Sequence, residues 1–186
     1  MNDDLQVDRV GDRLDGRTIA LCVTGGIAAV ESVKLIRHLR REGGDVNVYA
    51  TAEALKFVGR SALEWAAAKP VVVELSGLAE HICTEDAVLI APATINTVNA
   101  IAAGLADNAV TTLIASALGQ KTPILIAATG HVSLWDNPVF QKNLSELPKT
   151  APNVRFLPPR EEEGKAKLPE LLDLVEETVA ALSGGT

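Results

Sequence analysis

A short run of small residues, Thr24-Gly25-Gly26, follows the first strongly apolar stretch of the chain and precedes a long amphipathic one. A strand, a small-residue turn and a helix together form an anion site, because glycine lets the backbone approach a ligand and the first amides of a helix face it. The run has neither the GxGxxG pattern of dinucleotide folds nor the Gly-Lys-Ser/Thr of a Walker loop. It therefore indicates either a phosphate contact or a tight structural turn.

Two further polar segments follow apolar stretches in the same way. Thr51 comes directly after residues 46–50, and its hydroxyl is either a ligand contact or an ordinary helix cap. The segment Ala91-Pro92-Ala93-Thr94-Ile95-Asn96-Thr97 supplies hydroxyls and an amide at the end of another apolar run. Because the carboxyl ends of parallel strands lie at one edge of a sheet, these strand ends indicate a shared ligand crevice.

Short apolar runs alternate with longer amphipathic segments, which is typical of βαβ architecture. Continuous apolar runs predict strands that are covered on both faces, and apolar residues at helical spacing predict helices. The expected strands are residues 18–23, 46–50, 71–75, 87–91, 124–128 and 154–157. The expected helices are residues 27–41, 51–57, 61–68 with Ser61 as the cap, 97–103, 108–118 and 168–182. Together they predict an α/β fold, a three-layer parallel sheet with helices on both faces.

Composition limits the class of protein. The chain has 186 residues, of which 47% are hydrophobic, and this is enough for one domain with a core of its own. The net charge of −7 argues against general binding to nucleic acid or to anionic membranes, so small molecules or proteins are the expected partners. Cys22 and Cys83 are too few for a disulfide framework or a paired metal site, which fits a protein of the reducing cytoplasm without a metal.

The first residues of the chain are expected to lie apart from the rest. Residues 1–16 are acidic and lack the apolar core of a signal peptide, and no apolar stretch reaches the length that spans a membrane. We therefore expect no export. Residues 1–16 are predicted to form a mobile arm or a short helix outside the core, and residues 17–186 to form the domain itself.

Four motifs in the same order resemble the homo-oligomeric flavin-containing cysteine decarboxylases, particularly the phosphopantothenoylcysteine decarboxylase branch. APATINTVNAIAAGLADNAVTTL is similar to the family's APATANT segment and the Gly-x-Ala-Asp-Asn turn after it. VTGGIAA resembles the family's opening SGGIAA, and His81-Ile82 stands where the family has its active-site histidine. WDNPVFQKNL is similar to the segment that follows the family's PxMNxxMW substrate motif. The resemblance covers roughly residues 17–182.

The resemblance implies a flavodoxin-like, Rossmann-like sheet that assembles into trimers, or further into a dodecamer, with flavin mononucleotide (FMN) at a subunit boundary. Thr24 and Thr51 would contact the phosphate, and Gly25, Gly26 and Ile27 would shape its turn. The other cofactor residues would be Ala93, Thr94, Asn96 and Thr97, with Asp107 and Asn108 in the adjacent turn or interface.

The resemblance also implies a reaction. The family uses flavin to oxidise a cysteine-derived thiol to a thioaldehyde, whose sulfur stabilises the carbanion that remains when carbon dioxide leaves. His81 would be the acid/base, since the pKa of an imidazole lies near neutrality. His38 belongs to the basic segment KLIRHLRR and is expected to be a surface residue.

The sequence departs from the family on the substrate side. Ala128-Thr129-Gly130-His131 stands where the family has PAMN, so His131 either replaces the amide as a donor to the substrate carboxylate or indicates another substrate. The segment PPREEEGKAKLPELL stands at the usual flap but contains no cysteine, so another acid would complete the flavin's reoxidation or an enethiol would be released. Lys165 and Lys167 in this segment belong either to a mobile substrate-covering loop or to a charged connector.

The leading hypothesis is an FMN-dependent carboxy-lyase for a cysteine-containing small molecule or peptide terminus, such as phosphopantothenoylcysteine. One alternative is an FMN-dependent oxidoreductase with another substrate, which the altered segments would permit. Another is a non-catalytic flavin-binding regulatory subunit, against which the presence of His81 argues. The matches around His81 and in WDNPVFQKNL disfavour a flavin prenyltransferase.

Overall fold

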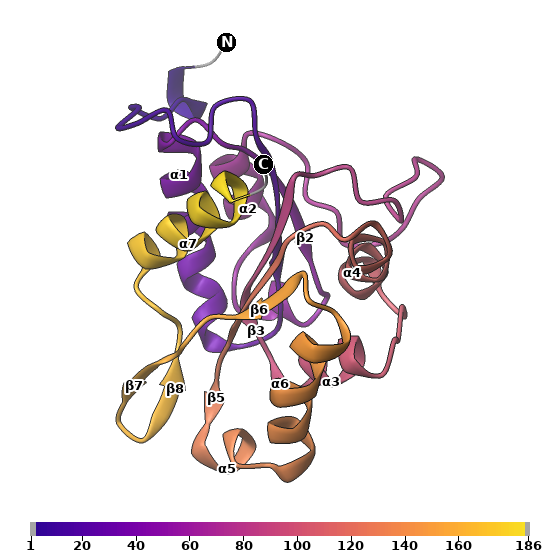
Figure 1. Ribbon diagram of the computed structural model, residues 1–186. Coiled ribbons are helices and arrows are strands. Elements are labelled where there is room, and N and C mark those ends of the chain that lie inside the picture. Colours follow the sequence, from indigo (N-terminus) through magenta and orange to yellow (C-terminus); the bar gives the residue numbers. More distant parts are fainter. Residues whose placement is uncertain (1–2, 185–186) are drawn as a thin grey trace.

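A five-stranded parallel sheet forms the centre of the protein in the computed structural model, which describes residues 3–184 (Figure 1). The strand order is β2-β1-β3-β4-β6. The strands are β1 (Thr18–Val23), β2 (Asp45–Ala50), β3 (Ala87–Ala93), β4 (Ile124–Ala128) and β6 (Val154–Phe156). All four pairings are parallel, and β3 lies in the middle with every residue buried. The predicted α/β architecture is confirmed.

Helices cover both faces of this sheet. One layer contains α1 (Ser32–Arg41), α2 (Arg60–Ala67) and α7 (Leu171–Ser183), and the other contains α3 (Ile95–Ala102), α4 (Ala109–Gln120) and α6 (Pro138–Thr150). Side chains of a strand alternate between the two faces. In β1, Ile19 and Leu21 therefore pack in the first layer, while Ala20 and Cys22 pack in the second.

A second, antiparallel sheet lies outside the central one and was not expected from the sequence. It has the order β5-β8-β7, with β5 (Gly130–His131), β7 (Arg160–Glu162) and β8 (Lys165–Lys167). Figure 1 shows the β7–β8 hairpin extending beside β5 and the short helix α5 (Val132–Trp135). These strands are only two or three residues long and mostly exposed, so they lack the apolar runs by which the central strands were predicted.

Several predicted elements differ from the observed ones. Residues 27–41 do not form one helix, because a 3-10 turn, η2 (Ile27–Glu31), precedes α1, and residues 51–57 contain only η3 (Ala54–Lys56). Ser61 does not cap α2, because it lies inside the helix and Gly59 is the N-cap. The strand expected at 71–75 is reduced to one bridge between Val72 and Tyr49, since the chain then turns away towards Gly77.

The N-terminal segment packs on the domain instead of lying outside its core. It begins with η1 (Asp3–Leu5). Leu14 is fully buried, and its amide donates to the carbonyl of Glu42. Arg13 forms ion pairs with Glu42 on one side and Glu176 of α7 on the other. Burial of the Leu14 side chain and these ion pairs explain why the segment docks, contrary to expectation. Within residues 3–184, no helix is long and apolar enough to cross a membrane.

Candidate functional site

Thr24 holds the ends of β1 and β3 together. Its side chain is buried, its hydroxyl donates to the carbonyl of Pro92 over 2.8 Å, and it accepts the amide of Thr94 over 2.9 Å. A phosphate offers only acceptors, and the single proton of this hydroxyl already has a partner. Thr24 therefore positions the ends of two loops, and its contact with the phosphate, which the family resemblance implied, stays a prediction.

Gly25 and Gly26 form the turn between β1 and η2. A Cβ atom at Gly25 would lie 2.5 Å from Glu53 Cβ, so only glycine allows the loop after β1 to pack on the loop after β2. Gly26 has an extended backbone and is the N-cap of η2. Among the described residues, the amides of Gly25 and Gly26 have no hydrogen-bond acceptor. These amides are therefore available to donate to an anion, which is one of the two alternatives for the glycine turn.

The two threonines at the start of α3 have structural partners. Thr94 is the N-cap, and its hydroxyl accepts the amide of Thr97 and lies 3.1 Å from the Thr97 hydroxyl. Ala93 and Thr97 are buried. At the end of β2, the hydroxyl of Thr51 accepts the amide of Ala54 over 3.2 Å. This contact stabilises the turn before η3, whose N-cap is Glu53, so Thr51 is not the cap itself, and its ligand contact stays a prediction.

A cavity of about 640 Å³ lies at the carboxyl ends of β1, β3 and β4. Three of the sequence motifs meet in it: the glycine turn, the start of α3 and the segment around His131. The β7–β8 hairpin closes one side. The lining includes, from the predicted site residues, Gly25, Gly26, Ile27, Thr94, His131, Lys165 and Lys167. The expected crevice therefore exists at the ends of β1 and β3, but Thr51 after β2 is not in its lining, and the end of β4 takes part instead.

His131 is oriented by its own turn. Its Nδ1 accepts the amide of Ser133 over 3.3 Å and lies 2.9 Å from the Ser133 hydroxyl. Because Nδ1 acts as an acceptor, the neutral ring carries its proton on Nε2, the nitrogen that is left to donate to a ligand. His131 also pairs with Lys165 across β5 and β8, so the two motifs that depart from the family are neighbours.

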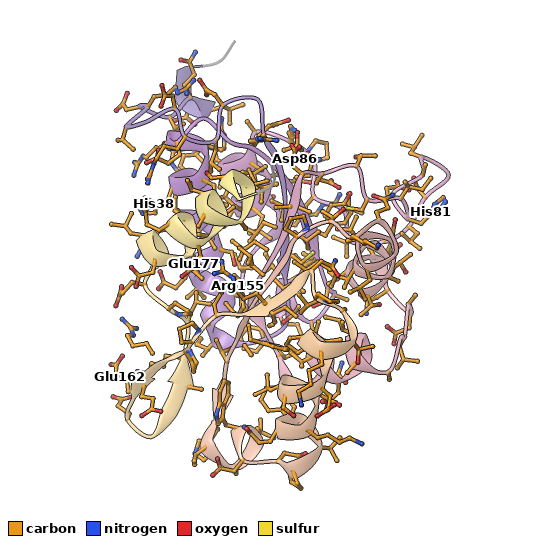
Figure 2. All side chains as sticks on the ribbon, viewed as in Figure 1. His38, His81, Asp86, Arg155, Glu162 and Glu177 are labelled. Carbon is orange, nitrogen blue, oxygen red and sulfur yellow. The ribbon has the colours of Figure 1, made fainter. Side chains whose placement is uncertain are left out.

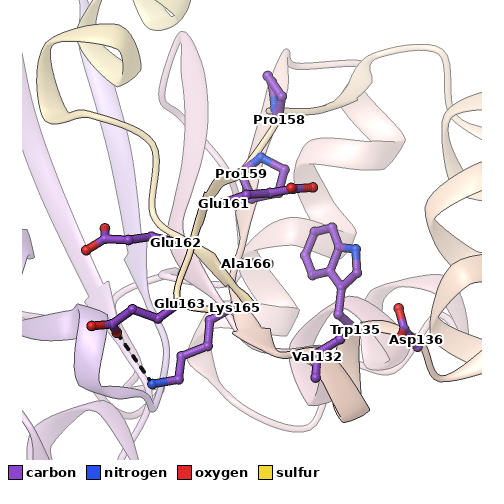
Figure 3. Close-up of a pocket in the computed structure, with 11 residues that line it drawn as sticks. Val132, Trp135, Asp136, Pro158, Pro159, Glu161, Glu162, Glu163, Lys165 and Ala166 are labelled. Carbon is purple, nitrogen blue, oxygen red and sulfur yellow. Dashed lines mark ion pairs between the residues drawn. The ribbon is translucent and has the colours of Figure 1, made fainter.

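The cysteine-free segment is a charged hairpin, and Figure 3 shows Glu163 paired with Lys165. Lys167 Nζ lies 3.0 Å from a Glu162 carboxylate oxygen and 3.1 Å from one of Glu163. These carboxylates raise the pKa of Lys167, and Lys167 lowers the pKa of Glu163. A second cavity of about 750 Å³ lies between the hairpin and Trp135 (Figure 3).

His81 lies far from the 640 Å³ cavity. It belongs to the exposed loop before β3, and Asp86 at the end of this loop donates its amide to Thr18 at the start of β1. His81 is thus at the amino end of β3, and a seven-residue strand spans about 20 Å. Figure 2 shows His81 and Glu162 of the hairpin on opposite flanks of the molecule. One chain does not bring His81 to the cavity.

Asn96, Asp107 and Asn108 also lie outside the cavity. Asn96 and Asp107 line a separate groove of about 480 Å³ with Leu105 and Val139. The carboxylate of Asp107 accepts hydrogen bonds from the side chains of Asn108 and Thr111. Asn108 is the N-cap of α4 and forms a capping box with Thr111. Asp107 and Asn108 therefore organise this turn, which is one of the two roles that the resemblance implied.

A buried polar network anchors the loop of His81 and was missed by the sequence analysis. The Glu85 carboxylate accepts hydrogen bonds from the Asn47 amide over 2.9 Å, the Tyr49 hydroxyl over 3.2 Å and the Thr84 backbone amide over 3.0 Å. Burial and the Glu85 carboxylate raise the pKa of Tyr49, and burial raises the pKa of Cys83. An acidic residue next to an apolar strand usually marks a solvated strand end, so the sequence contained no signal for this burial.

Metal-ligand geometry is absent from the described part of the chain. No group of three or more His, Cys, Asp or Glu side chains in residues 3–184 is arranged to hold a metal ion. Cys22 and Cys83 are buried and form no disulfide, and burial raises the pKa of both thiols. Neither thiol has the electropositive, accessible surroundings of a reactive cysteine.

Comparison with known proteins identifies the family. The model of the family described as Flavoprotein matches residues 8–183. The chain belongs to the flavoprotein family. This flavoprotein is 39% identical over 177 residues to the coenzyme A biosynthesis bifunctional protein CoaBC of Thermococcus kodakarensis, and 34% identical over 169 residues to that of Methanocaldococcus jannaschii. The matches cover 91% and 89% of this chain but 43% and 41% of the relatives, so the flavoprotein spans about two fifths of their length.

Solved structures show the same fold. The FMN-dependent cysteine decarboxylase SpaF matches with a TM-score of 0.80 and 22% identity, over 92% of this flavoprotein and 99% of SpaF. A PPC decarboxylase mutant complexed with pantothenoylaminoethenethiol matches with a TM-score of 0.75 and 20% identity, over 90% and 99% of the two chains. The family resemblance and the flavodoxin-like fold that it implied are confirmed.

Proposed function

We propose that this flavoprotein binds FMN and decarboxylates phosphopantothenoylcysteine. The observation that carries the proposal is the cavity at the carboxyl ends of the strands, where Gly25 and Gly26, Thr94 and His131 converge from three separate motifs. The CoaBC names of the curated relatives support coenzyme A biosynthesis as the setting. The FMN-dependent decarboxylases among the solved structures support the reaction class.

The residues present in the cavity fit a flavin nucleotide. The amides of Gly25 and Gly26 would donate to its phosphate, and Ile27 and Leu134, which are 76% and 48% exposed, would provide apolar surface for the ring. When bound, the flavin would supply the oxidation of the substrate thiol to a thioaldehyde. Thr24 would act indirectly, because its two hydrogen bonds fix the loops that carry these groups.

Two histidines would have different roles towards the substrate, His131 in binding and His81 in proton transfer. The Nε2–H group of His131 would donate a hydrogen bond to the substrate carboxylate or amide. The contacts of Nδ1 to Ser133 would hold the imidazole ring in position for this bond. His81 would take or return the proton that moves during oxidation and decarboxylation. The β7–β8 hairpin beside His131 would cover the substrate and exclude water.

His81 can act in the proposed reaction only if another copy of the chain brings it to the cavity. The proposed role of His81 therefore requires a homo-oligomer. Leu75, Leu78 and Ile82 flank His81 with exposures of 46%, 85% and 44%, which is apolar surface suited to burial against another copy. A trimer, alone or within a dodecamer, would place each His81 loop next to a neighbouring cavity. The two buried, unpaired thiols fit the reducing cytoplasm as the compartment.

Product analysis tests the proposal. The FMN-loaded protein should release carbon dioxide from phosphopantothenoylcysteine under anaerobic conditions, and mass spectrometry should find the decarboxylated thiol or enethiol. An unchanged substrate, together with bleaching of the flavin by a reduced pyridine nucleotide, would favour the oxidoreductase alternative. Absence of FMN binding in absorbance and fluorescence titrations would contradict the proposal that the cavity binds a flavin.

A further inference from the structure

Positive side chains gather on the hairpin wall of the 640 Å³ cavity, although the whole chain has a net charge of −7. Arg160, Lys165 and Lys167 line this wall, and His131 lies next to them. The carboxylates in the lining are Glu31 and Glu163, so the formal charge of the lining is positive. A local excess of positive charge in an acidic protein attracts an anionic ligand.

Strand register holds these side chains in one patch. Lys165 and Lys167 are two residues apart in β8 and therefore point to the same face, whereas Ala166 between them is buried. Arg160 of β7 is the register partner of Lys167, and His131 of β5 is the partner of Lys165. We call Arg160, Lys165 and Lys167 the cationic row. Two paired strands, β7 and β8, rather than one flexible loop, hold the cationic row, and β5 pairs with β8 beside it.

The present partners of the cationic row are exchangeable. Arg160 pairs with Glu162 and Glu170, Lys167 pairs with Glu162 and Glu163, and Lys165 lies 3.7 Å from Glu163. The side chains of these three glutamates are 47% to 66% exposed. Exposed ion pairs contribute little to stability, so the carboxylates can turn to solvent when a stronger anion arrives.

We propose that the cationic row binds a phosphate monoester, the terminal phosphate of the substrate. A phosphate dianion carries more charge than a carboxylate and offers three acceptor oxygens, and the guanidinium of Arg160 can bind two of them in parallel. The proposal rests on the proposed function and deepens it, because it makes the hairpin the element that distinguishes a phosphorylated substrate from an unphosphorylated one. FMN is also a phosphate monoester, so the test must separate the two sources.

Ligand titration of the FMN-loaded protein provides the test, with 4′-phosphopantothenate and pantothenate as probes. The wild type should bind the phosphorylated probe more tightly. Arg160→Gln and Lys167→Gln should each weaken binding of the phosphorylated probe about tenfold and leave pantothenate unchanged, as expected for a lost charge-assisted hydrogen bond. Lys149→Gln is the matched control, since Lys149 forms an exposed ion pair on α6 outside the cavity lining, and it should change neither affinity.

Three results would overturn the assignment. The wild type could bind both probes equally, or the variants could lose affinity for both probes alike. The variants could also keep their preference for 4′-phosphopantothenate but lose the preference for FMN over riboflavin. In that case the cationic row would bind the phosphate of FMN and not that of the substrate. These titrations need no turnover, so they test the cationic row separately from the reaction. Tighter binding of 4′-phosphopantothenate than of pantothenate, without release of carbon dioxide, would contradict the proposed decarboxylation but support the phosphate site.

Discussion

The cavity at the carboxyl edge of the sheet and the loop of His81 differ in how they are built. The cavity is made by strand ends and turns that hold one another, as Thr24 does between Pro92 and Thr94. The His81 loop lies at the amino end of β3, and its exposed tip carries Leu78 and His81 itself. Under the proposed function, one chain would form the ligand site, and the His81 loop would supply the proton-transfer group to the cavity of a neighbouring copy.

The largest effect is expected from His81→Asn. Loss of a general acid/base should lower the decarboxylation rate about 10²- to 10⁴-fold, while FMN binding stays unchanged because the groups proposed to hold the flavin, the Gly25 and Gly26 amides and the Ile27 side chain, are intact. His38→Asn is the control, since His38 lies on α1 in the layer away from the His81 loop (Figure 2). Steady-state rates and a flavin titration measure both properties. Unchanged turnover in His81→Asn would remove His81 from the mechanism.

A second large effect is expected from Gly25→Ala in the cavity. The new Cβ would lie 2.5 Å from Glu53 Cβ and 3.0 Å from the Glu53 backbone carbon, so the loop must move, and overpacking of this kind costs about 1–3 kcal/mol. Denaturant unfolding should show this loss, and FMN affinity should fall with it. Gly119→Ala in α4 meets nothing within 4 Å and should be neutral or stabilising. Equal stability of the two variants would contradict the close packing of the two loops.

The sequence predicted the central strands better than it predicted the site. A strand with a continuous apolar run, such as residues 124–128, can bury both of its faces only between two layers of helices. The hydropathy of the run therefore predicts both the strand and its burial. The β7–β8 hairpin has no such signal, because its stability depends on pairing with Gly130 and His131, far away in the sequence. For the same reason motif order could not show that His81 and the cavity lie apart.

A smaller effect is expected from Thr24→Val. The substitution keeps the shape but removes the hydroxyl that bonds to Pro92 and Thr94, and an unsatisfied buried partner costs about 1–3 kcal/mol. FMN affinity should fall only as far as the two loops separate. Thr24→Ser retains the hydroxyl and should recover most of the lost stability in the same unfolding measurement. If FMN affinity collapsed while stability stayed unchanged, Thr24 would be a direct ligand contact.

The smallest effect concerns pH and lies outside both regions. Arg13 lowers the pKa of Glu42, so the folded state favours the ionised carboxylate. The stabilisation is present above the unfolded value of about 4.5 and is lost as the pH falls through the lower folded pKa. Glu42→Gln and Arg13→Gln should each reduce this loss of unfolding free energy in acid. The double variant should add nothing further, because both substitutions break the same pair.

Mixing two inactive variants tests most directly whether the site is shared between copies. His81→Asn disables the proton-transfer group, and Gly26→Asp places a carboxylate beside the expected phosphate, where a Cβ meets nothing closer than 3.9 Å. Each variant alone should be inactive. Co-assembled in equal amounts, with mixing verified by co-purification of differently tagged copies, they should recover about a quarter of the wild-type decarboxylation rate, because a quarter of randomly formed sites combine two intact halves. Verified mixed oligomers without activity would contradict a site shared between copies.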